Sequence, residues 1–402
     1  MPYEVSIAAC ADYDDALVRF AVRDALAPLG GLERFVQPGQ RVLIKLNLLS
    51  ACAPERAVTT HPALVKAVVQ LVQELGGLPV IGDSPGGLNT PTAYRAVLAE
   101  TGMQAVIDET GCAVVNFDDE VVQINSAQAR VFKQFTAVRA PLDADVVICL
   151  PKVKTHQFAY YTGAVKLLYG FLPGLTKAEY HLHAGRDIAN FAELLLDIHD
   201  TLTPTLTIMD AVVGMEGNGP THGAPKQIGL LLASTSCTAL DYVMCEIIGL
   251  PPMRVPTVRA ARERGGGPGT LEEITVHGEP LDHVRLPDFQ QAEALTLAGG
   301  MPTWFADVSS WLFATRPIID KRTCVHCGKC VKHCPPQAMT IKPGACPTID
   351  DTPCLRCYCC QELCPVGAVR VGAPRVRFPV KLGDWLVPLL DRLRKIGRRG
   401  RK

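Results

Sequence analysis

The chain has 402 residues, of which 48% are hydrophobic and 20% are charged. A chain of this length and composition can bury at least one large core, which excludes a disordered adaptor and leaves room for two or three domains. Lys plus Arg and Asp plus Glu are equal at 40 each, so the charge balance gives no support for a nucleic-acid partner or an acidic substrate.

Residues 1–287 predict an α/β domain built on a largely parallel sheet with helices on its faces. Apolar runs rich in β-branched residues alternate with longer stretches of helical period, which is typical of this class. Thr60-His61-Pro62 and Thr90-Pro91 each place an N-cap candidate beside a proline, and residues 187–201 carry an apolar helical face. The predicted strands are residues 4–8, 41–46, 78–81, 112–116, 145–150, 206–209 and 227–232.

Polar residues cluster where several of these strands end. Because the carboxyl ends of parallel strands line the ligand crevice of an open sheet, we expect the clusters to converge. Each cluster alone also fits a tight turn or a solvated strand end, but five at one edge favour a site. The clusters are Lys45-Leu46-Asn47, Gly82-Asp83-Ser84, Pro151-Lys152-Val153-Lys154-Thr155-His156, Asp210 and Gly214-Met215-Glu216-Gly217-Asn218-Gly219-Pro220.

The composition of these clusters predicts a cationic pocket. Lys152, Lys154 and Lys166 lie within fifteen residues of one another, and together with His156 they suit a carboxylate or a phosphate. The glycine-rich run offers backbone N–H groups without side-chain bulk. The acidic side chains balance this charge or bind a metal, and the sequence leaves that choice open. Neither a G-x-G-x-x-G nor a Walker A sequence occurs, so a Rossmann dinucleotide site or a P-loop is unsupported.

Four of the five clusters, together with Thr162-Gly163-Ala164-Val165-Lys166-Leu167 and with Pro85 after Ser84, resemble the domain-of-unknown-function family 362. The resemblance covers roughly residues 5–290. It implies a two-cluster ferredoxin domain at one end of the chain, as members often carry. It implies no particular reaction, because none can be assigned to the whole family.

The sixteen cysteines predict metal ligands rather than disulfides. Ten of them lie between Cys324 and Cys364, in a long chain without a recognisable secretion signal. A reducing cytosol keeps thiols free, so a dense cysteine cluster in such a chain indicates metal binding. The scattered cysteines are interpreted as small buried apolar residues. They are Cys10, Cys52, Cys112, Cys149, Cys237 and Cys245.

Residues 317–376 predict a small α+β ferredoxin-like domain with two [4Fe-4S] clusters. The sequence Cys324-x2-Cys327-x2-Cys330-x3-Cys334-Pro335 repeats 30 residues later as Cys354-x2-Cys357-x2-Cys360-x3-Cys364-Pro365. A pair of zinc knuckles would leave the third cysteine and the Cys-Pro of each repeat unexplained. In the bacterial ferredoxin pattern, which this repeat closely resembles, the fourth cysteine belongs to the other cluster. The predicted ligand sets are Cys324, Cys327, Cys330 and Cys364, and Cys354, Cys357, Cys360 and Cys334, with Cys346 and Cys359 as bystanders.

Two further segments flank this domain. Residues 288–316 form an apolar linker with Trp304, Phe305 and Trp311, which we expect to pack against another surface. Residues 377–402 form a basic amphipathic tail, in which Lys381–Lys402 holds eight basic and two acidic residues. Such a tail suits an anionic membrane surface, and the alternative is a solubilising tail that packs back on the ferredoxin domain. With no apolar run of about 18 residues, we expect a soluble cytoplasmic protein, with contact to the cytoplasmic face of a membrane through the tail.

Two functions are compatible with these features. In the first, the ferredoxin domain passes electrons to an anionic substrate or to a second cofactor, a flavin or a metal, in the large domain. In the second, the chain is a non-catalytic electron carrier or assembly protein whose large domain binds a partner. Both imply a redox partner protein, and neither specifies an oligomeric state. The catalytic candidates are Lys152, His156, Lys45 and Asp83, and the ligand-binding candidates are Lys154, Lys166, Glu216, Gly217 and Asn218.

Overall fold

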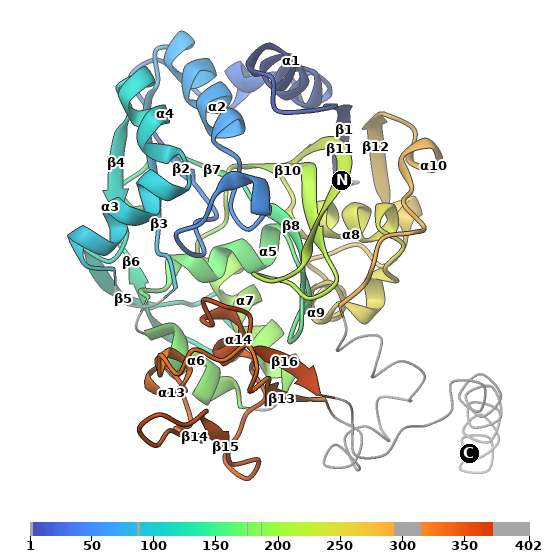
Figure 1. Cartoon of the computed structure of the whole chain (residues 1–402). Coiled ribbons are helices and arrows are strands. Elements are labelled where there is room, and N and C mark those ends of the chain that lie inside the picture. Colours follow the sequence, from blue (N-terminus) through green and yellow to red (C-terminus); the bar gives the residue numbers. More distant parts are fainter. Residues whose placement is uncertain (1–2, 87–88, 175, 186, 293–314, 373–402) are drawn as a thin grey trace, which may run out of the picture. The chain divides into compact units, whose positions relative to one another are not determined.

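The computed structural model describes residues 3–86, 89–174, 176–185, 187–292 and 315–372 (Figure 1). These belong to two units, Met1–Gln290 and Gln291–Lys402, each of which is considered by itself. Most of the predicted linker and the whole predicted tail lie outside the described residues. No helix within the described ranges is long and apolar enough to cross a membrane.

The first unit is an α/β domain around one large sheet, whose described part has ten strands. Five strands run parallel through the middle and one side of the sheet, and β11 is antiparallel to both of its neighbours. The sheet is therefore largely parallel, as predicted. Its main path is β12 (Ile274–Gly278), β1 (Tyr3–Ala9), β11 (Ala224–Ser234), β10 (Leu206–Glu216), β7 (Val146–Cys149), β2 (Arg41–Lys45), β3 (Leu78–Asp83) and β4 (Ala113–Asn116).

Helices cover both faces of this sheet (Figure 1). The central strands β2 and β7 are apolar almost throughout, because both of their faces are buried. The main core lies between the sheet and the layer that contains the first helices of the chain. One layer holds α1 (Asp15–Leu26), α2 (Pro62–Glu74), α3 (Pro91–Glu100) and α4 (Met103–Thr110), and α5 (Ala164–Leu167), α7 (Ile188–Thr201), α8 (Cys237–Ile247) and α9 (Pro256–Arg264) pack with one another elsewhere on the sheet.

The predicted helix starts are confirmed. The side chain of Thr90 accepts a hydrogen bond from the Ala93 N–H at 3.2 Å, and Asp187 caps α7 in the same way. At α2 the cap is His61, because the Thr60 hydroxyl is used elsewhere. The remaining short helices are α6 (Thr176–Ala184) and α10 (Leu281–Val284), with 3-10 turns η1 (Ala27–Leu29), η2 (Leu32–Arg34), η3 (Pro54–Arg56), η4 (Leu168–Phe171), η5 (Pro252–Arg254) and η6 (Leu271–Glu273).

Two predicted strand-end clusters are themselves largely strand, and Asp210 lies inside β10 rather than after it. Residues 152–156 form β8 (Lys152–His156), which pairs with β10 and with β9 (Tyr160–Thr162). The first residues of the glycine-rich run belong to β10, which extends to Glu216. These strands were not predicted because their many polar residues are typical of an exposed loop. In the structure these side chains are buried among other polar groups. A separate hairpin, β5 (Val121–Asn125) with β6 (Gln134–Val138), was also not predicted.

The second unit is a small α+β domain of two similar halves. Strand β13 (Arg316–Ile319) pairs with β16 (Val369–Gly372), and β14 (Met339–Thr340) pairs with β15 (Thr348–Ile349). Each half also has one short helix, α13 (Lys329–Lys332) or α14 (Cys359–Glu362), which contains the third cysteine of its motif. This arrangement follows the internal repeat of the sequence.

Candidate functional site

A buried ion pair joins the ends of β2 and β3. The Lys45 ammonium donates to the Asp83 carboxylate at 2.5 Å, and both residues are almost completely buried. The second Asp83 oxygen accepts the Leu48 N–H at 2.6 Å. Gly170 packs against this pair so closely that a Cβ there would lie 2.4 Å from the Lys45 Nζ. The charge of Lys45 is therefore neutralised inside the domain.

A second buried pair lies on β8 and β10. The Lys152 ammonium donates to the Asp210 carboxylate at 3.0 Å and to the Tyr13 hydroxyl at 2.7 Å. Tyr13 in turn donates to the other Asp210 oxygen at 2.7 Å, and its ring stacks on His61 at 3.5 Å between centroids. Burial lowers the pKa of Lys152, which the Asp210 carboxylate opposes. This four-residue group had not been predicted beyond Lys152 and Asp210.

The other predicted residues on β8 also bind partners within the large domain. The Lys154 ammonium donates to the Asn47 side-chain oxygen at 2.6 Å and to the Val58 carbonyl at 2.7 Å. The His156 Nδ1 accepts the N–H groups of Phe158 and Ala159 at 3.0 and 3.1 Å. Nδ1 therefore has no proton in this arrangement, and the neutral ring holds its proton on Nε2.

The glycine-rich segment is also bound within the domain. The Gln157 amide donates to the Asn218 oxygen at 3.1 Å. The Glu216 carboxylate accepts the Gln290 N–H at 2.9 Å, and the Gly217 N–H donates to the Gln290 carbonyl at 2.8 Å. These contacts hold Glu216 and Gly217 beside residue 290, whereas Asn218 lies beside β8.

Ser84, from a predicted cluster, lies next to the first ion pair and binds two residues that the strand-end argument did not point to. The Ser84 hydroxyl donates to the Asp118 carboxylate at 2.6 Å and accepts from the Lys177 ammonium at 2.9 Å. Burial lowers the pKa of Lys177 to about 8, and the nearby Lys45 and Lys166 act in the same direction. Asp83 and Asp118 oppose this shift. Lys177 lies on α6, far from any strand end in sequence, which is why the pattern of strands did not point to it.

The structure thus brings some of the predicted residues together. Lys45 and Asp83 are in direct contact, with Lys166 close enough to act on the same lysine of α6. Lys152, Lys154 and His156 alternate along β8 and so share one of its faces. At this edge the half-buried cations are Lys166 and Lys177, whereas Lys45, Lys152 and Lys154 are almost completely buried.

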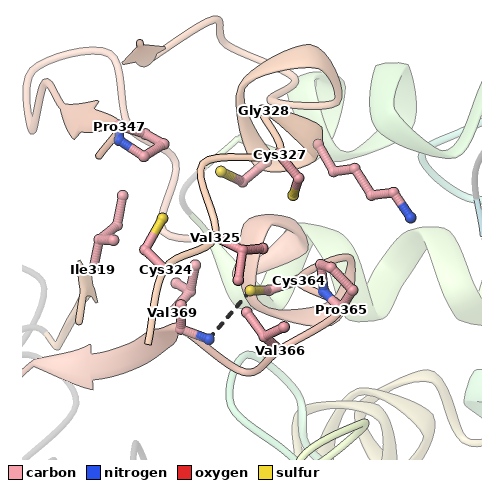
Figure 2. Close-up of a pocket in the computed structure, with 13 residues that line it drawn as sticks. Ile319, Cys324, Val325, Cys327, Gly328, Pro347, Cys364, Pro365, Val366 and Val369 are labelled. Atoms are coloured by element: carbon pink, nitrogen blue, oxygen red, sulfur yellow. Dashed lines mark hydrogen bonds between the residues drawn. The ribbon is translucent and has the colours of Figure 1, made fainter. Parts of the chain in front are cut away.

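In the second unit, the predicted cysteines line two cavities within the described residues. Figure 2 shows the sulfurs of Cys324, Cys327 and Cys364 around the first cavity. Each cavity takes three cysteines from one motif and one from the other. The first is lined by Cys324, Cys327, Cys330 and Cys364, and the second by Cys334, Cys354, Cys357 and Cys360.

Backbone hydrogen bonds explain how the fourth cysteine crosses. The Asp320 N–H, four residues before the first motif, donates to the Ala368 carbonyl at 2.7 Å, four residues after Cys364. In the other half the Asp350 N–H donates to the Ala338 carbonyl at 2.8 Å, four residues after Cys334. The start of each motif is therefore bonded to the end of the other. This exchange brings each Cys-Pro cysteine to the opposite cavity.

The chemistry of the two cavities fits iron–sulfur clusters. Four thiols around an apolar space are the donor set that a [4Fe-4S] cluster requires. The Cys334 and Cys364 sulfurs already accept backbone N–H groups, from Ala338 at 3.3 Å and Ala368 at 3.2 Å. Hydrogen bonds of this kind stabilise thiolate charge and help to set a cluster's potential. Burial raises the pKa of the Cys334 thiol, so a bound metal would be needed to remove its proton.

The two cavities differ in exposure. Cys327, in the first cavity, is exposed, and the flanking Val325 and Val366 are 58% and 39% exposed. Cys354 and Cys357, in the second, are each only 7% exposed. The first cavity also lies within a basic segment, because Lys321, Arg322, Lys329 and Lys332 are all exposed.

Comparison with known proteins agrees with this two-part organisation. A family model described as domain of unknown function (DUF362) matches residues 42–246, and a 4Fe-4S dicluster domain matches residues 323–368. A thylakoid-associated protein of Synechocystis sp. is 39% identical over 285 residues, which are 71% of this chain and 85% of that protein.

Two solved structures also align with the chain. They are the lactate racemase apoprotein from Thermoanaerobacterium thermosaccharolyticum, with a TM-score of 0.39 and 11% identity, and a structural-genomics protein from Thermotoga maritima, with a TM-score of 0.33 and 9% identity. The alignments cover 58% and 50% of this chain, and the chain spans about half of each structure, 54% and 51%. The family match covers half of the chain and the relative is similar over most of its own length. The chain therefore belongs to the DUF362 family and also contains a 4Fe-4S dicluster domain.

Proposed function

We propose that this chain transfers electrons one at a time through two [4Fe-4S] clusters to an anionic substrate or second cofactor held by the large domain. The 4Fe-4S domain supports the iron–sulfur electron-transfer role. The observation that carries the proposal of two clusters is the pair of four-cysteine cavities, each completed by a cysteine from the other half. Cys324, Cys327, Cys330 and Cys364 would hold cluster I, and Cys354, Cys357, Cys360 and Cys334 would hold cluster II.

The difference in exposure supports an order of transfer. Cluster I, beside the exposed Cys327, would exchange electrons with an external redox protein, and the more buried cluster II would be the inner centre. The exposed cations around cluster I favour a partner with an acidic surface, because opposite charges speed encounter and orient docking. When bound, the clusters supply the one-electron chemistry, and the protein supplies their ligands, hydrogen bonds and burial.

The crossed ligands can be tested with Cys334→Ala. Under the proposal this substitution removes a ligand of cluster II, although Cys334 belongs to the first motif. Anaerobic purification followed by electron paramagnetic resonance of the reduced protein should show loss of one cluster signal, and Cys357→Ala should remove the same signal. Cys330→Ala should remove the other one. If Cys334→Ala and Cys330→Ala abolish the same signal, the ligands are not crossed.

The proposed binding site for the anionic ligand lies at the edge of the large sheet. Lys45, Lys152 and Lys154 contribute positive charge there, and each of the three is almost completely buried. We assign direct contact with an anionic ligand to Lys177 and Lys166, because these two side chains are half-buried and therefore more accessible. A lysine whose pKa is about 8 can also release or accept a proton near neutral pH, which a reduction coupled to protonation requires.

Calorimetry with small carboxylates and phosphates tests this assignment. Lys177→Met should weaken binding by roughly 1.5–3 kcal/mol, the range for a hydrogen bond to a charged group, without loss of iron. Lys66→Met, which alters a surface lysine paired with Asp15 and Glu109, is the control and should bind like the unaltered protein. Equal affinity in all three proteins would favour the alternative, a non-catalytic carrier or assembly protein.

Attachment to a membrane surface is a second proposal. It is favoured by the basic tail, residues 377–402, and by the relative that is described as thylakoid-associated. Co-sedimentation with vesicles of anionic lipid should retain the full chain and lose a chain that ends at residue 376. Equal retention of both proteins would place the attachment outside the tail.

A further inference from the structure

Cys346 lies beside the first cavity, although it belongs to neither four-cysteine motif. Its sulfur is 3.3 Å from the His326 Nε2, and the ligand atoms of Cys324, His326 and Cys346 all lie within 4.8 Å of one another. Pro347, the next residue, lines the cavity itself, and Figure 2 shows it on the same side as Cys324. A loop between the two motifs therefore brings a ninth thiol to one corner of the site.

The distances decide what this thiol can reach. A metal–thiolate bond is about 2.3 Å long, so two sulfurs that can bind the same metal ion in turn lie no more than about 4.6 Å apart. The Cys324 and Cys346 sulfurs lie no more than 4.8 Å apart. A small rotation of either side chain would bring them within the roughly 4.6 Å that a shared iron requires. The iron held by Cys324 would thus be within reach of Cys346 with little movement of the backbone.

We infer that Cys346 is a reserve ligand for cluster I, able to replace Cys324 on the same iron. This inference rests on the proposed assignment of cluster I. In the exchange the iron–sulfur bond to Cys324 breaks and one to Cys346 forms, and the Cys346 thiol proton passes through solvent to the departing Cys324 thiolate. His326 holds the Cys346 side chain toward this corner through its ring nitrogen. Because cluster I is the exposed one, a second thiol at this corner would preserve it when the first ligand is lost.

The inference predicts an asymmetry among the ligands of one cluster. Cys324→Ala should keep iron and acid-labile sulfide close to the level of the unaltered protein after anaerobic purification. The control is Cys327→Ala. Cys327 lines the same cavity, but within the described residues it is not part of the close group formed by Cys324, His326 and Cys346. Cys327→Ala should lose cluster I and therefore about half of the iron. The double variant Cys324→Ala with Cys346→Ala should lose the same amount.

Alkylation gives a second measurement that does not depend on iron content. In the native unaltered protein Cys346 should react with iodoacetamide, and in Cys324→Ala it should be protected, as peptide mass spectrometry would show. Equal iron loss in Cys324→Ala and Cys327→Ala, or a Cys346 that reacts in both proteins, would overturn the inference. If the unaltered protein itself holds no iron, the proposed clusters are refuted instead.

Discussion

Individual buried charges in the large domain are paired with groups of the same domain. Lys152 and Asp210 have side chains that are 1% and 0% exposed, and Tyr13 hydrogen-bonds to both. A buried pair of this kind is weak evidence for stability as such, but removing one partner leaves an uncompensated charge away from water. The pairing should therefore affect the free energy of unfolding most clearly when only one of the two residues is substituted.

Lys152→Met should lower the free energy of unfolding of the large domain by about 3–5 kcal/mol, because Asp210 would remain charged and buried. Adding Asp210→Asn should recover part of this loss. The control is Lys66→Met, which breaks a solvated pair and should cost about 0–1 kcal/mol. Urea unfolding followed by circular dichroism measures all three. A Lys152→Met variant as stable as Lys66→Met would show that the charge of Lys152 is not balanced by Asp210.

At this scale the sequence identified some of the site and missed the rest for a physical reason. Lys45 and Asp83 end apolar strands, so their position at the sheet edge could be predicted. Asp210 lies inside β10, which continues beyond the predicted end at residue 209. Tyr13 and Lys177 reach the same edge from a loop and from a helix, and only the packing of the chain brings them there. The sequence also could not show that Lys45 and Lys152 pair with Asp83 and Asp210, because these partners are distant along the chain.

Among the elements, helix α2 begins at a residue that also contacts the second ion pair, Lys152 with Asp210. Its cap, His61, accepts the Ala63 N–H through Nδ1 at 3.2 Å, and its own N–H donates to Asp210 at 2.9 Å. Burial lowers the pKa of His61 to about 4 from its ordinary value of 6.5, against the opposing effect of Asp210. A protonated Nδ1 cannot accept the hydrogen bond, so the cap requires the neutral ring.

This pKa shift predicts a pH dependence with a definite sign. Between about pH 6.5 and pH 4 the unfolded chain binds a proton on His61 more strongly than the folded chain. The contribution of His61 to stability is therefore complete above pH 6.5 and falls as the pH drops toward 4, by at most about 1.4 kcal/mol per pH unit. His61→Asn keeps a capping oxygen and does not titrate. Its stability, measured by urea unfolding at pH 7 and pH 5, should fall less than that of the unaltered protein, and an equal fall would exclude this role.

The strands illustrate which elements a sequence can reveal. All seven predicted strands are present. The central strands β2 and β7 are the easiest to recognise, because an apolar β-branched run between turns is typical of a strand that is buried on both faces. Strand β8 has the sequence Lys-Val-Lys-Thr-His and lies buried against β10, so its polar residues suggested a loop. A buried polar strand is stable only when partners for its side chains are supplied by distant segments, and no local pattern records them.

At the scale of the whole molecule, the chain joins a DUF362 domain to an internally duplicated cysteine domain. The duplication could be predicted in detail, since the spacing of eight cysteines and two Cys-Pro pairs is highly specific. The exchange of the Cys-Pro cysteines between the halves follows from the paired hydrogen bonds of Asp320 and Asp350. The position of Cys346 could not be predicted, because it lies between the motifs and reaches the first cavity only through the fold.

The central claim is that the eight motif cysteines hold two [4Fe-4S] clusters. The most direct test is the iron and acid-labile sulfide content of the full chain purified without oxygen, combined with electron paramagnetic resonance after reduction. We predict about eight iron and eight sulfide per chain, with signals from two reduced clusters, since each four-cysteine cavity would hold one. Zinc in place of iron, or about four iron with a single cluster signal, would contradict the account.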